Sequence, residues 1–228
     1  RTPPRWPTHS SISDSGRPLL YWAARAALEC PDIDRVYVAS DNTEIRDVAR
    51  AMRHAKLVVT ERSAETCTDE ASSESALLEF AEARTFERVF FIQATNPFLR
   101  SSDLSAALAH LGATGSDSLL SVTREYRFRW LEKTTRTVTP ANYDPTMRPR
   151  RQDWPGELVE NGAFYLTGRD ALLRSKCRVS GVIAAWEMAA CSGLEVDKAE
   201  DWTMIESVFR AKMRGGSKGV DAGDHDRA

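Results

Sequence analysis

The feature that most constrains the fold is a regular alternation of short apolar runs with amphipathic segments. Pro18 followed by LLYWAARAALEC predicts a helix, because its apolar residues form one stripe at helical spacing. Further strands are expected at 35–40, 57–60, 88–93, 118–123 and 163–167, and further helices near 45–52, 73–84, 102–111 and 201–213. This order predicts an α/β fold, with a Rossmann-like, mostly parallel sheet and helices on both faces.

The alternation begins with a helix, although this fold class leads us to expect a strand first. Residues 1–16 contain prolines at positions 3, 4 and 7, and proline lacks the backbone donor that an interior strand needs. We therefore expect an irregular segment at 1–15, a main domain at 16–213 and a mobile tail at 214–228. Arginines, aromatics and prolines cluster at 124–160, which predicts an excursion from the sheet.

The composition excludes several classes of partner. The 31 basic and 33 acidic residues nearly cancel, so no overall field favours nucleic acid or an anionic membrane. The four cysteines form no CxxC pair, which argues against a zinc knuckle and a disulfide scaffold. Prolines, serines and a histidine stand near the N-terminus, where a signal peptide would need an apolar stretch, so we expect no signal peptide, and no run of eighteen apolar residues occurs in the sequence. We expect a cytoplasmic protein, with the nucleus as the alternative in a eukaryote.

The segment MRPRRQDWPGELVENGAFYL (147–166) is the most informative stretch of the chain. It concentrates Arg148, Arg150 and Arg151 ahead of a Pro-Gly turn and the polar triplet 160–162. Guanidinium groups bind carboxylate or phosphate through paired, charge-assisted hydrogen bonds, and an asparagine offers both a donor and an acceptor. The segment therefore predicts an anion receptor. A solvated basic loop or a nuclear-import signal is an equally weighted alternative.

Two acidic residues near the C-terminal end form a candidate metal site. In LEVD (194–197), Glu195 and Asp197 are two residues apart, so an extended backbone directs both carboxylates to the same side. Mg²⁺ takes one or two protein carboxylates and completes its shell with water and phosphate oxygens. The alternative is an exposed acidic face, which is the more frequent origin of such a pair.

Two loops that follow predicted strands offer polar groups where α/β proteins bind ligands. FIQATNPFLR (91–100) carries Gln93 beyond a buried strand, and Pro97 delays the next helix. ERSAETCTDEASS (61–73) carries Arg62 and the serines Ser72 and Ser73. The alternative for the serines is a helix cap without any contact to a ligand.

Together these segments resemble the CMP-sialic acid synthetases (N-acylneuraminate cytidylyltransferases), especially the animal type, over roughly residues 16–208. RPRRQDW followed by GEL and ENGAFY carries most of the resemblance, whereas the Q-A-T-x-P loop is shared with other sugar cytidylyltransferases. The resemblance implies a fold of the nucleotide-diphospho-sugar transferase type. It also implies a homodimer or tetramer, in which the excursion at 124–160 reaches into the partner's site.

The resemblance further implies a role for individual residues. Glu195, Asp197 and Arg151 would be catalytic, and the two carboxylates would hold Mg²⁺. The nucleotide, CTP, would lie against Arg62, Ser72 and Gln93, and the acidic nine-carbon sugar would face Arg151, Gln152 and Asn161.

The sequence departs from the family pattern at two places. Glu195 stands where the family usually has aspartate, which lengthens the side chain by one methylene. The family also opens with a strand and a glycine-rich phosphate loop, whereas here the letters RGGSKG occur at 214–219. Three accounts remain open: the tail supplies the loop, the gene is rearranged or its first exon misassigned, or the match is accidental.

The expected activity is transfer of a cytidylyl group from CTP to N-acylneuraminate, which releases pyrophosphate. Two alternatives remain. One is a catalytically impaired relative that binds a sugar nucleotide, since the N-terminal phosphate loop is absent from its usual place. The other is a cytidylyltransferase for another acidic sugar, such as deoxy-octulosonate (Kdo) or Kdn.

Overall fold

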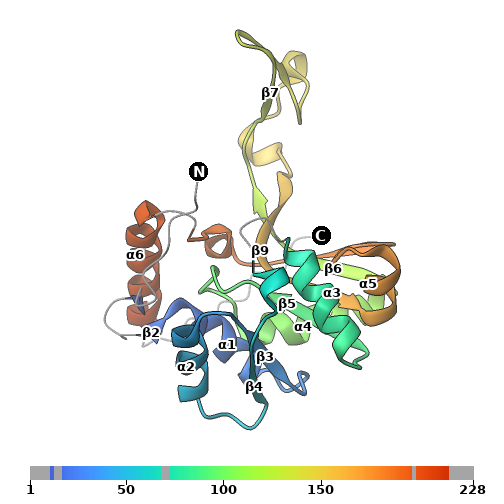
Figure 1. Ribbon diagram of the computed structural model, residues 1–228. Coiled ribbons are helices and arrows are strands. Elements are labelled where there is room, and N and C mark those ends of the chain that lie inside the picture. The colour runs from blue at the N-terminus through green and yellow to red at the C-terminus, as the bar shows by residue number, and fades with distance from the viewer. Residues whose placement is uncertain (1–10, 13–16, 68–71, 197–198, 216–228) are drawn as a thin grey trace.

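The computed structural model describes residues 11–12, 17–67, 72–196 and 199–215, and Figure 1 shows how they are arranged. The elements in chain order are β1 (Ser11–Ile12), β2 (Arg17–Pro18), α1 (Leu19–Glu29), β3 (Val36–Ala39), α2 (Thr43–Ala51), β4 (Leu57–Thr60), η2 (Ala64–Thr66), α3 (Ser73–Ala83), β5 (Arg88–Ile92), α4 (Ser101–Thr114), β6 (Ser118–Glu125), β7 (Trp130–Thr134), β8 (Thr137–Pro140), η3 (Pro145–Met147), η4 (Arg151–Asp153), β9 (Glu157–Gly168), α5 (Arg169–Ser175), β10 (Ile183–Glu187), η5 (Ala190–Gly193) and α6 (Ala199–Gly215).

Local chemistry sets several helix ends. The Asn42 side chain caps α2 by accepting hydrogen bonds from the backbone N–H groups of Glu44 and Ile45. Ser72 caps α3 in the same way, through the backbone N–H of Ser75. Pro18 is the N-cap of α1 rather than its first helical residue. The predicted helices are therefore confirmed, with shifts of a few residues at their ends.

The main sheet has four strands in the order β10-β6-β9-β5, and β3 pairs with β4 as a separate parallel ladder. β10 runs parallel to β6, whereas β9 runs antiparallel to both β5 and β6. β5, β6 and β10 therefore share one direction, and β9 alone is reversed. The predicted α/β class with a mostly parallel sheet is confirmed.

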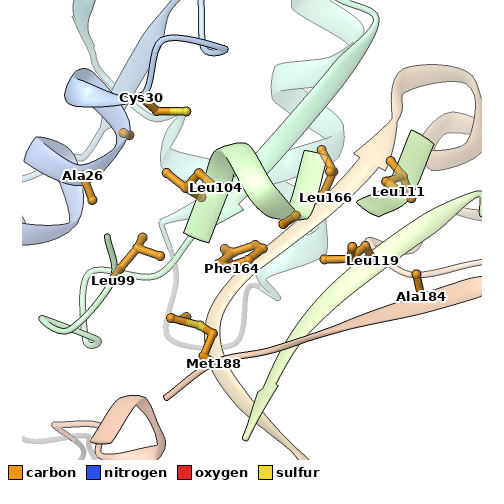
Figure 2. Packing of buried hydrophobic residues seen from close by; sticks show 13 residues of the cluster. Ala26, Cys30, Leu99, Leu104, Leu111, Leu119, Phe164, Leu166, Ala184 and Met188 are labelled. Carbon is orange, nitrogen blue, oxygen red and sulfur yellow. The ribbon is translucent and has the colours of Figure 1, made fainter. Parts of the chain in front are cut away.

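Helices cover both faces of this sheet. Leu104 and Leu111 of α4 pack with Phe164, Leu166 and Leu119 of the sheet, as Figure 2 shows, and α1 adds its alanines to the same cluster. The opposite face packs against α3 and α5, through a cluster of Leu77, Ala81 and Leu172, with Val89 and Phe91 against it. Side chains on a strand alternate between the faces, so β5 contributes Phe90 and Ile92 to the first cluster and Val89 and Phe91 to the second.

Several elements differ from the sequence prediction. The strand expected at 163–167 starts at Glu157, because its first half pairs with the end of β6. Neither α5 nor β10 was predicted, since both are short and lie in a stretch without a long apolar period.

The predicted excursion at 124–160 contains the hairpin β7–β8, which projects from the body of the molecule (Figure 1). Trp130, Leu131 and Val138 on this hairpin are about half exposed. The hairpin stands on a two-stranded stem, because residues 122–125 of β6 pair with residues 157–160 of β9. We call the segment 126–156 the arm.

Some expectations fall outside the described residues: the segment 1–10, the tail 216–228 and Asp197. Of the letters RGGSKG, only the first two positions are described, and they belong to α6. Within the described part of the chain, no helix has both the length and the apolar composition required to cross a membrane.

Candidate functional site

Gly162 is the point at which two of the predicted site residues meet. Its φ of 62° lies in the left-handed region that favours glycine. A Cβ placed on it would lie 2.6 Å from Gln93 Oε1 and still closer to Glu195 Oε1. Both oxygens therefore occupy the space that any other residue would fill. The structure thus brings Gln93 and Glu195 together, and we call Gln93, Gly162 and Glu195 the glycine cluster.

An irregularity between β6 and β9 accompanies the turn at Gly162. The register shifts between Leu120, which pairs with Tyr165, and Val122, which pairs with Glu160. Ser121 lies opposite the extra residues, and its hydroxyl both accepts from the backbone N–H and donates to the carbonyl oxygen of Phe164, each at 2.9 Å. This β-bulge re-aims the chain at residues 161–163, as bulges beside functional sites commonly do.

A buried set of hydrogen bonds fixes the segment that carries Glu195. The fully buried Asn96 side chain donates to the carbonyl oxygen of Ser192 at 2.7 Å and to that of Asn161 at 3.4 Å. The backbone N–H of Val196 donates to the carbonyl oxygen of Thr95 at 3.3 Å. Hydrogen bonds before and after Glu195 therefore tie its segment to the loop that follows β5.

Asn161 is 3% exposed, and its amide contacts protein atoms. Its Oδ1 accepts from the backbone N–H of Ala163, and its Nδ2 lies 3.3 Å from the Met188 sulfur. These contacts hold the turn on which Gly162 sits. The prediction that Asn161 faces the sugar is untested.

Tyr165 and Arg178 lie close to the cluster, and the sequence analysis missed both. The Tyr165 hydroxyl donates to Glu160, and its pKa is raised by burial, by that hydrogen bond and by the charges of Glu160 and Glu195. The Arg178 guanidinium lies 4.4 Å from the centre of the Tyr165 ring. Because side chains alternate along a strand, the sequence could have predicted that Tyr165 points to the other face of the sheet from Phe164. Arg178 sits in a loop whose sequence carries no such signal.

Arg178 also reaches the start of α3. Its Nε lies 3.0 Å from the Glu74 carboxylate, while its Nη1 is buried and has no hydrogen-bond partner among the described residues. A buried guanidinium nitrogen without a partner retains its capacity to donate. The site thus contains a cation as well as the Glu160 and Glu195 carboxylates.

Arg62 follows β4 and is held by the loop it belongs to. One of its terminal nitrogens donates to the carbonyl oxygen of Thr66, while its Nε is buried with no hydrogen-bond partner among the described residues. The Glu79 carboxylate of α3 accepts from the hydroxyls of Thr66 and Ser63 at 2.6 and 3.0 Å. These bonds lower the pKa of Glu79, chiefly through Thr66.

The remaining predicted residues occupy more exposed positions. Ser72 is the exposed N-cap of α3, which confirms that it caps the helix, and its contact with a nucleotide stays a prediction. Arg151 and Gln152 are exposed in η4, at the surface of the arm. Within the single chain, neither of these two residues contacts the glycine cluster in any described interaction. Beside them, Arg148 lies over the Phe128 ring and Arg150 pairs with Asp153.

The candidate metal pair is only partly visible. Glu195 is described and half-buried, whereas Asp197 lies outside the described residues. Within the described ranges, no three His, Cys, Asp or Glu side chains are grouped so that they could hold a metal ion. A Mg²⁺ site requires only one or two protein carboxylates, so the prediction for Glu195 and Asp197 remains untested.

A mostly parallel sheet between helices, with polar side chains gathered where its strands end, places this chain in the class of α/β proteins that bind ligands at the strand ends. The family model described as Cytidylyltransferase matches residues 14–189, and the chain belongs to this family. The fold is similar to 4-diphosphocytidyl-2C-methyl-D-erythritol synthase from Anaerococcus prevotii, with a TM-score of 0.65, 11% identity and 87% and 88% of the two chains covered. It is also similar to CMP:2-keto-3-deoxy-manno-octonic acid synthetase complexed with CTP, with a TM-score of 0.60, 17% identity and coverage of 86% and 88%.

The sequence is more similar to curated sialic acid enzymes. It is 39% identical over 196 residues to N-acylneuraminate cytidylyltransferase B of Danio rerio, covering 84% of this chain and 45% of the relative. It is 36% identical over 211 residues to N-acylneuraminate cytidylyltransferase of Oncorhynchus mykiss, covering 91% and 47%. The resemblance found in the sequence is confirmed. The chain spans about half the length of these curated relatives.

Replacing Gly162 by alanine should cost more stability than the same change at Gly115. Both glycines have a φ of 62°, so alanine brings about 1 kcal/mol of backbone strain at either position. Only at Gly162 does the new Cβ collide with Gln93 and Glu195, since Gly115 has open space around it. Overpacking should add about 1–3 kcal/mol, measured by urea unfolding. Equal losses at the two positions would contradict the contact.

Glu79→Gln should destabilise the protein in a pH-dependent manner. Because the folded-state pKa of Glu79 is below its usual 4.5, its carboxylate stabilises the fold above that value and loses the effect as pH falls through the lowered pKa. Urea unfolding should show a loss of about 1 kcal/mol near pH 7, which shrinks near pH 3. Glu82→Gln, exposed on the same helix, is the control. A pH-independent difference between the two variants would refute this account.

Proposed function

We propose that this protein transfers the cytidylyl group of CTP to an N-acylneuraminate, giving CMP-N-acylneuraminate and pyrophosphate. The identity of 36–39% to N-acylneuraminate cytidylyltransferases over most of this chain carries the proposal. The segment RPRRQDW with GEL and ENGAFY supports the same substrate class. Of the glycine cluster, Gly162 is the third residue of this ENGAFY segment.

In the proposed reaction, the anomeric hydroxyl of the sugar attacks the α-phosphorus of CTP. One phosphorus–oxygen bond forms, the bond to the β-phosphate bridge breaks, and pyrophosphate leaves with the bonding electron pair while the hydroxyl proton is released. Positioning and charge neutralisation dominate transfers of this kind. The protein must therefore hold two anions in contact while their charges are compensated.

Arg62, Ser72 and Gln93 are the proposed nucleotide-binding residues. The partnerless Nε of Arg62 can donate to an anionic or carbonyl oxygen, and the Gln93 amide can both donate and accept. Ser72 caps α3, and the N-terminus of a helix attracts negative charge. Arg62 follows β4, Ser72 caps the helix α3 that comes next, and Gln93 follows β5. This arrangement suits one extended ligand.

Glu195 and Asp197 are the proposed Mg²⁺ ligands. The half-buried Glu195 carboxylate suits the ion, because Gly162 has no Cβ to displace its Oε1 or the amide oxygen of Gln93, and both are hard oxygen donors. When bound, the ion would neutralise charge that develops on the phosphate oxygens. The chain itself holds the Glu195 segment in place through Asn96 and Thr95.

The proposed sugar-binding residues are Arg151, Gln152 and Asn161. A guanidinium pairs with a carboxylate through two parallel hydrogen bonds, which would orient an acidic sugar and disfavour a neutral one. Arg151 is exposed on the arm, whereas Asn161 supports the turn at Gly162. We therefore propose a homodimer in which the arm of one chain carries Arg151 to the glycine cluster of the other.

The geometry of the arm supports this dimer. It projects from the body in Figure 1 and exposes Trp130, Leu131, Val138 and Met147, a set of large apolar side chains that a partner chain would cover. Its aromatic base is ordered by contacts among Phe128, Tyr143 and Trp154. Exposed apolar side chains on an arm whose aromatic residues pack together suit a permanent interface.

The activity is tested by incubating the protein with CTP, Mg²⁺ and N-acetylneuraminic acid and measuring pyrophosphate. We expect release that depends on both substrates and on the metal. Glu195→Gln should lower kcat on the order of 100-fold. Glu44→Gln, exposed in the first turn of α2, should leave it unchanged. The absence of release with any acidic sugar at varied pH and metal would overturn the proposed activity.

Mixing two inactive variants tests whether the arm acts on the partner chain. An Arg151→Ala chain retains the glycine cluster, and a Glu195→Gln chain retains the arm arginine. Random pairing makes about half of the dimers mixed, and one of the two sites in each mixed dimer is intact. Activity should therefore recover to about a quarter of the wild-type value after refolding together. No recovery would mean that both residues serve the same chain's site.

A further inference from the structure

The arm stands on a stem that the neighbouring strand β10 supports only in part. β10 pairs with β6 from Ser118 to Val122, and the backbone N–H of Met188 donates to the carbonyl oxygen of Val122 at 2.8 Å. Beyond Val122, the described pairing of β6 is with β9, between residues 123–125 and 157–159. A two-stranded ribbon has little stability of its own and twists strongly. The direction of the arm therefore needs a further support.

Arg124 provides such a support at the end of β10. Its Nε lies 3.0 and 3.2 Å from the two carboxylate oxygens of Glu187, and its Nη2 donates to one of them at 2.7 Å. Glu187 is the last residue of β10 and pairs with Val122, two residues before Arg124 on the same face of β6. The planar guanidinium group fixes the relative orientation of the two side chains as well as their separation.

The same guanidinium group also holds the returning chain of the arm. Its Nη1 donates to the carbonyl oxygen of Pro155 at 3.0 Å. The next residue, Gly156, has a φ of 71° and packs so closely on the stem that a Cβ there would lie 2.7 Å from the carbonyl oxygen of Glu125. One side chain thus joins three segments: the end of β6, the end of β10 and the turn from which the arm returns to β9.

Other polar contacts of this region act within the arm and its stem. The Arg129 guanidinium lies 3.3 Å from the Glu157 carboxylate, and the Asn142 amide donates to the same carboxylate at 2.7 Å. These contacts fasten the base of the arm to the stem, but they do not reach β10. The Arg124–Glu187 pair joins the stem to the body of the sheet, from which the arm projects in Figure 1.

We propose that Arg124, held by Glu187, is a positioning residue that sets the direction of the arm and thereby the place of Arg151. This inference rests on the proposed function, in which the arm carries Arg151 to the glycine cluster of the partner chain. Among the described interactions, Arg124 does not contact the glycine cluster, so its effect is exerted through the arm. Misplacing a group that orients a substrate by about 1 Å can cost on the order of 100-fold in rate.

The pair should affect one substrate more than the other. The proposed sugar-binding residues Arg151 and Gln152 lie on the arm, whereas the proposed nucleotide-binding residues 62, 72 and 93 lie on the body. A loosened arm therefore displaces the groups that bind the sugar and leaves those that bind CTP in place. A purely structural role would instead reduce the amount of folded enzyme, and with it the apparent kcat, without separating the two KM values.

Steady-state kinetics of Arg124→Gln and Glu187→Gln test this separation. Each variant should raise the KM of the sugar about tenfold and change the KM of CTP by less than about twofold. Arg50→Gln, which removes the exposed pair with Asp47 on α2, is the matched control and should change neither KM. Equal changes in both KM values, or no change in either, would overturn the proposal.

The double variant Arg124→Gln/Glu187→Gln tests whether the two residues act through each other. Its KM for the sugar should rise little more than in the stronger single variant, because either change alone already breaks the pair. Effects that multiply in the double variant would contradict positioning through this pair.

Amide hydrogen exchange without substrates separates a failure of this inference from a failure of the proposed function. In Arg124→Gln, exchange at 123–125 and 157–159 should become about fivefold faster or more, while exchange at 118–120 changes much less. Arg50→Gln should leave all three ranges unchanged. Unchanged exchange in the stem would overturn the support of the arm by Arg124. Faster exchange, together with no pyrophosphate release by the wild-type protein, would uphold that support and overturn the proposed transfer.

Discussion

The rest of the structure depends on the reversed strand β9, in which residues 164–168 pair with β5 while residues 157–160 and 165–167 pair with β6. Its side chains alternate between two cores, so Phe164 and Leu166 pack beneath α4 while Tyr165 faces the side of α3 and α5. Because both faces and both edges are engaged, β9 cannot slip by one residue without exchanging its apolar and polar sides. This fixed register determines where residue 162 falls.

The glycine cluster follows from that register. The bulge opposite Ser121 turns the chain at Gly162, and the absence of a side chain there admits Gln93 from the loop after β5 and Glu195 from the segment after η5. Asn96 links the same two segments through the carbonyl oxygens of Asn161 and Ser192. Polar groups buried in this way are costly unless they are paired, so the network specifies one arrangement of the site. The proposed chemistry uses this rigidity to place charge before substrate arrives.

The division of the sheet and the projecting arm have a common consequence for the proposed activity. Arg62 follows β4 and Gln93 follows β5, which belong to separate hydrogen-bonded ladders among the described residues, and Arg151 lies on an exposed arm. The described part of one chain therefore contains the residues proposed to bind the nucleotide, the metal and the sugar, but it does not bring all of them together at one site. In the proposed dimer, a second chain would supply Arg151.

The sequence by itself determined the α/β class, most helices and strands, the family and the residues 62, 72, 93, 151, 152, 161, 195 and 197 as candidates, because periodicity and local motifs are properties of neighbouring residues. It did not reveal β10, α5, Tyr165 or Arg178, whose roles arise from contacts between distant segments. Only the tertiary structure decided that Gly162 admits Gln93 and Glu195, that Asn161 supports the turn, and that Arg151 is exposed. These outcomes depend on strand register and long-range packing, which no local pattern encodes.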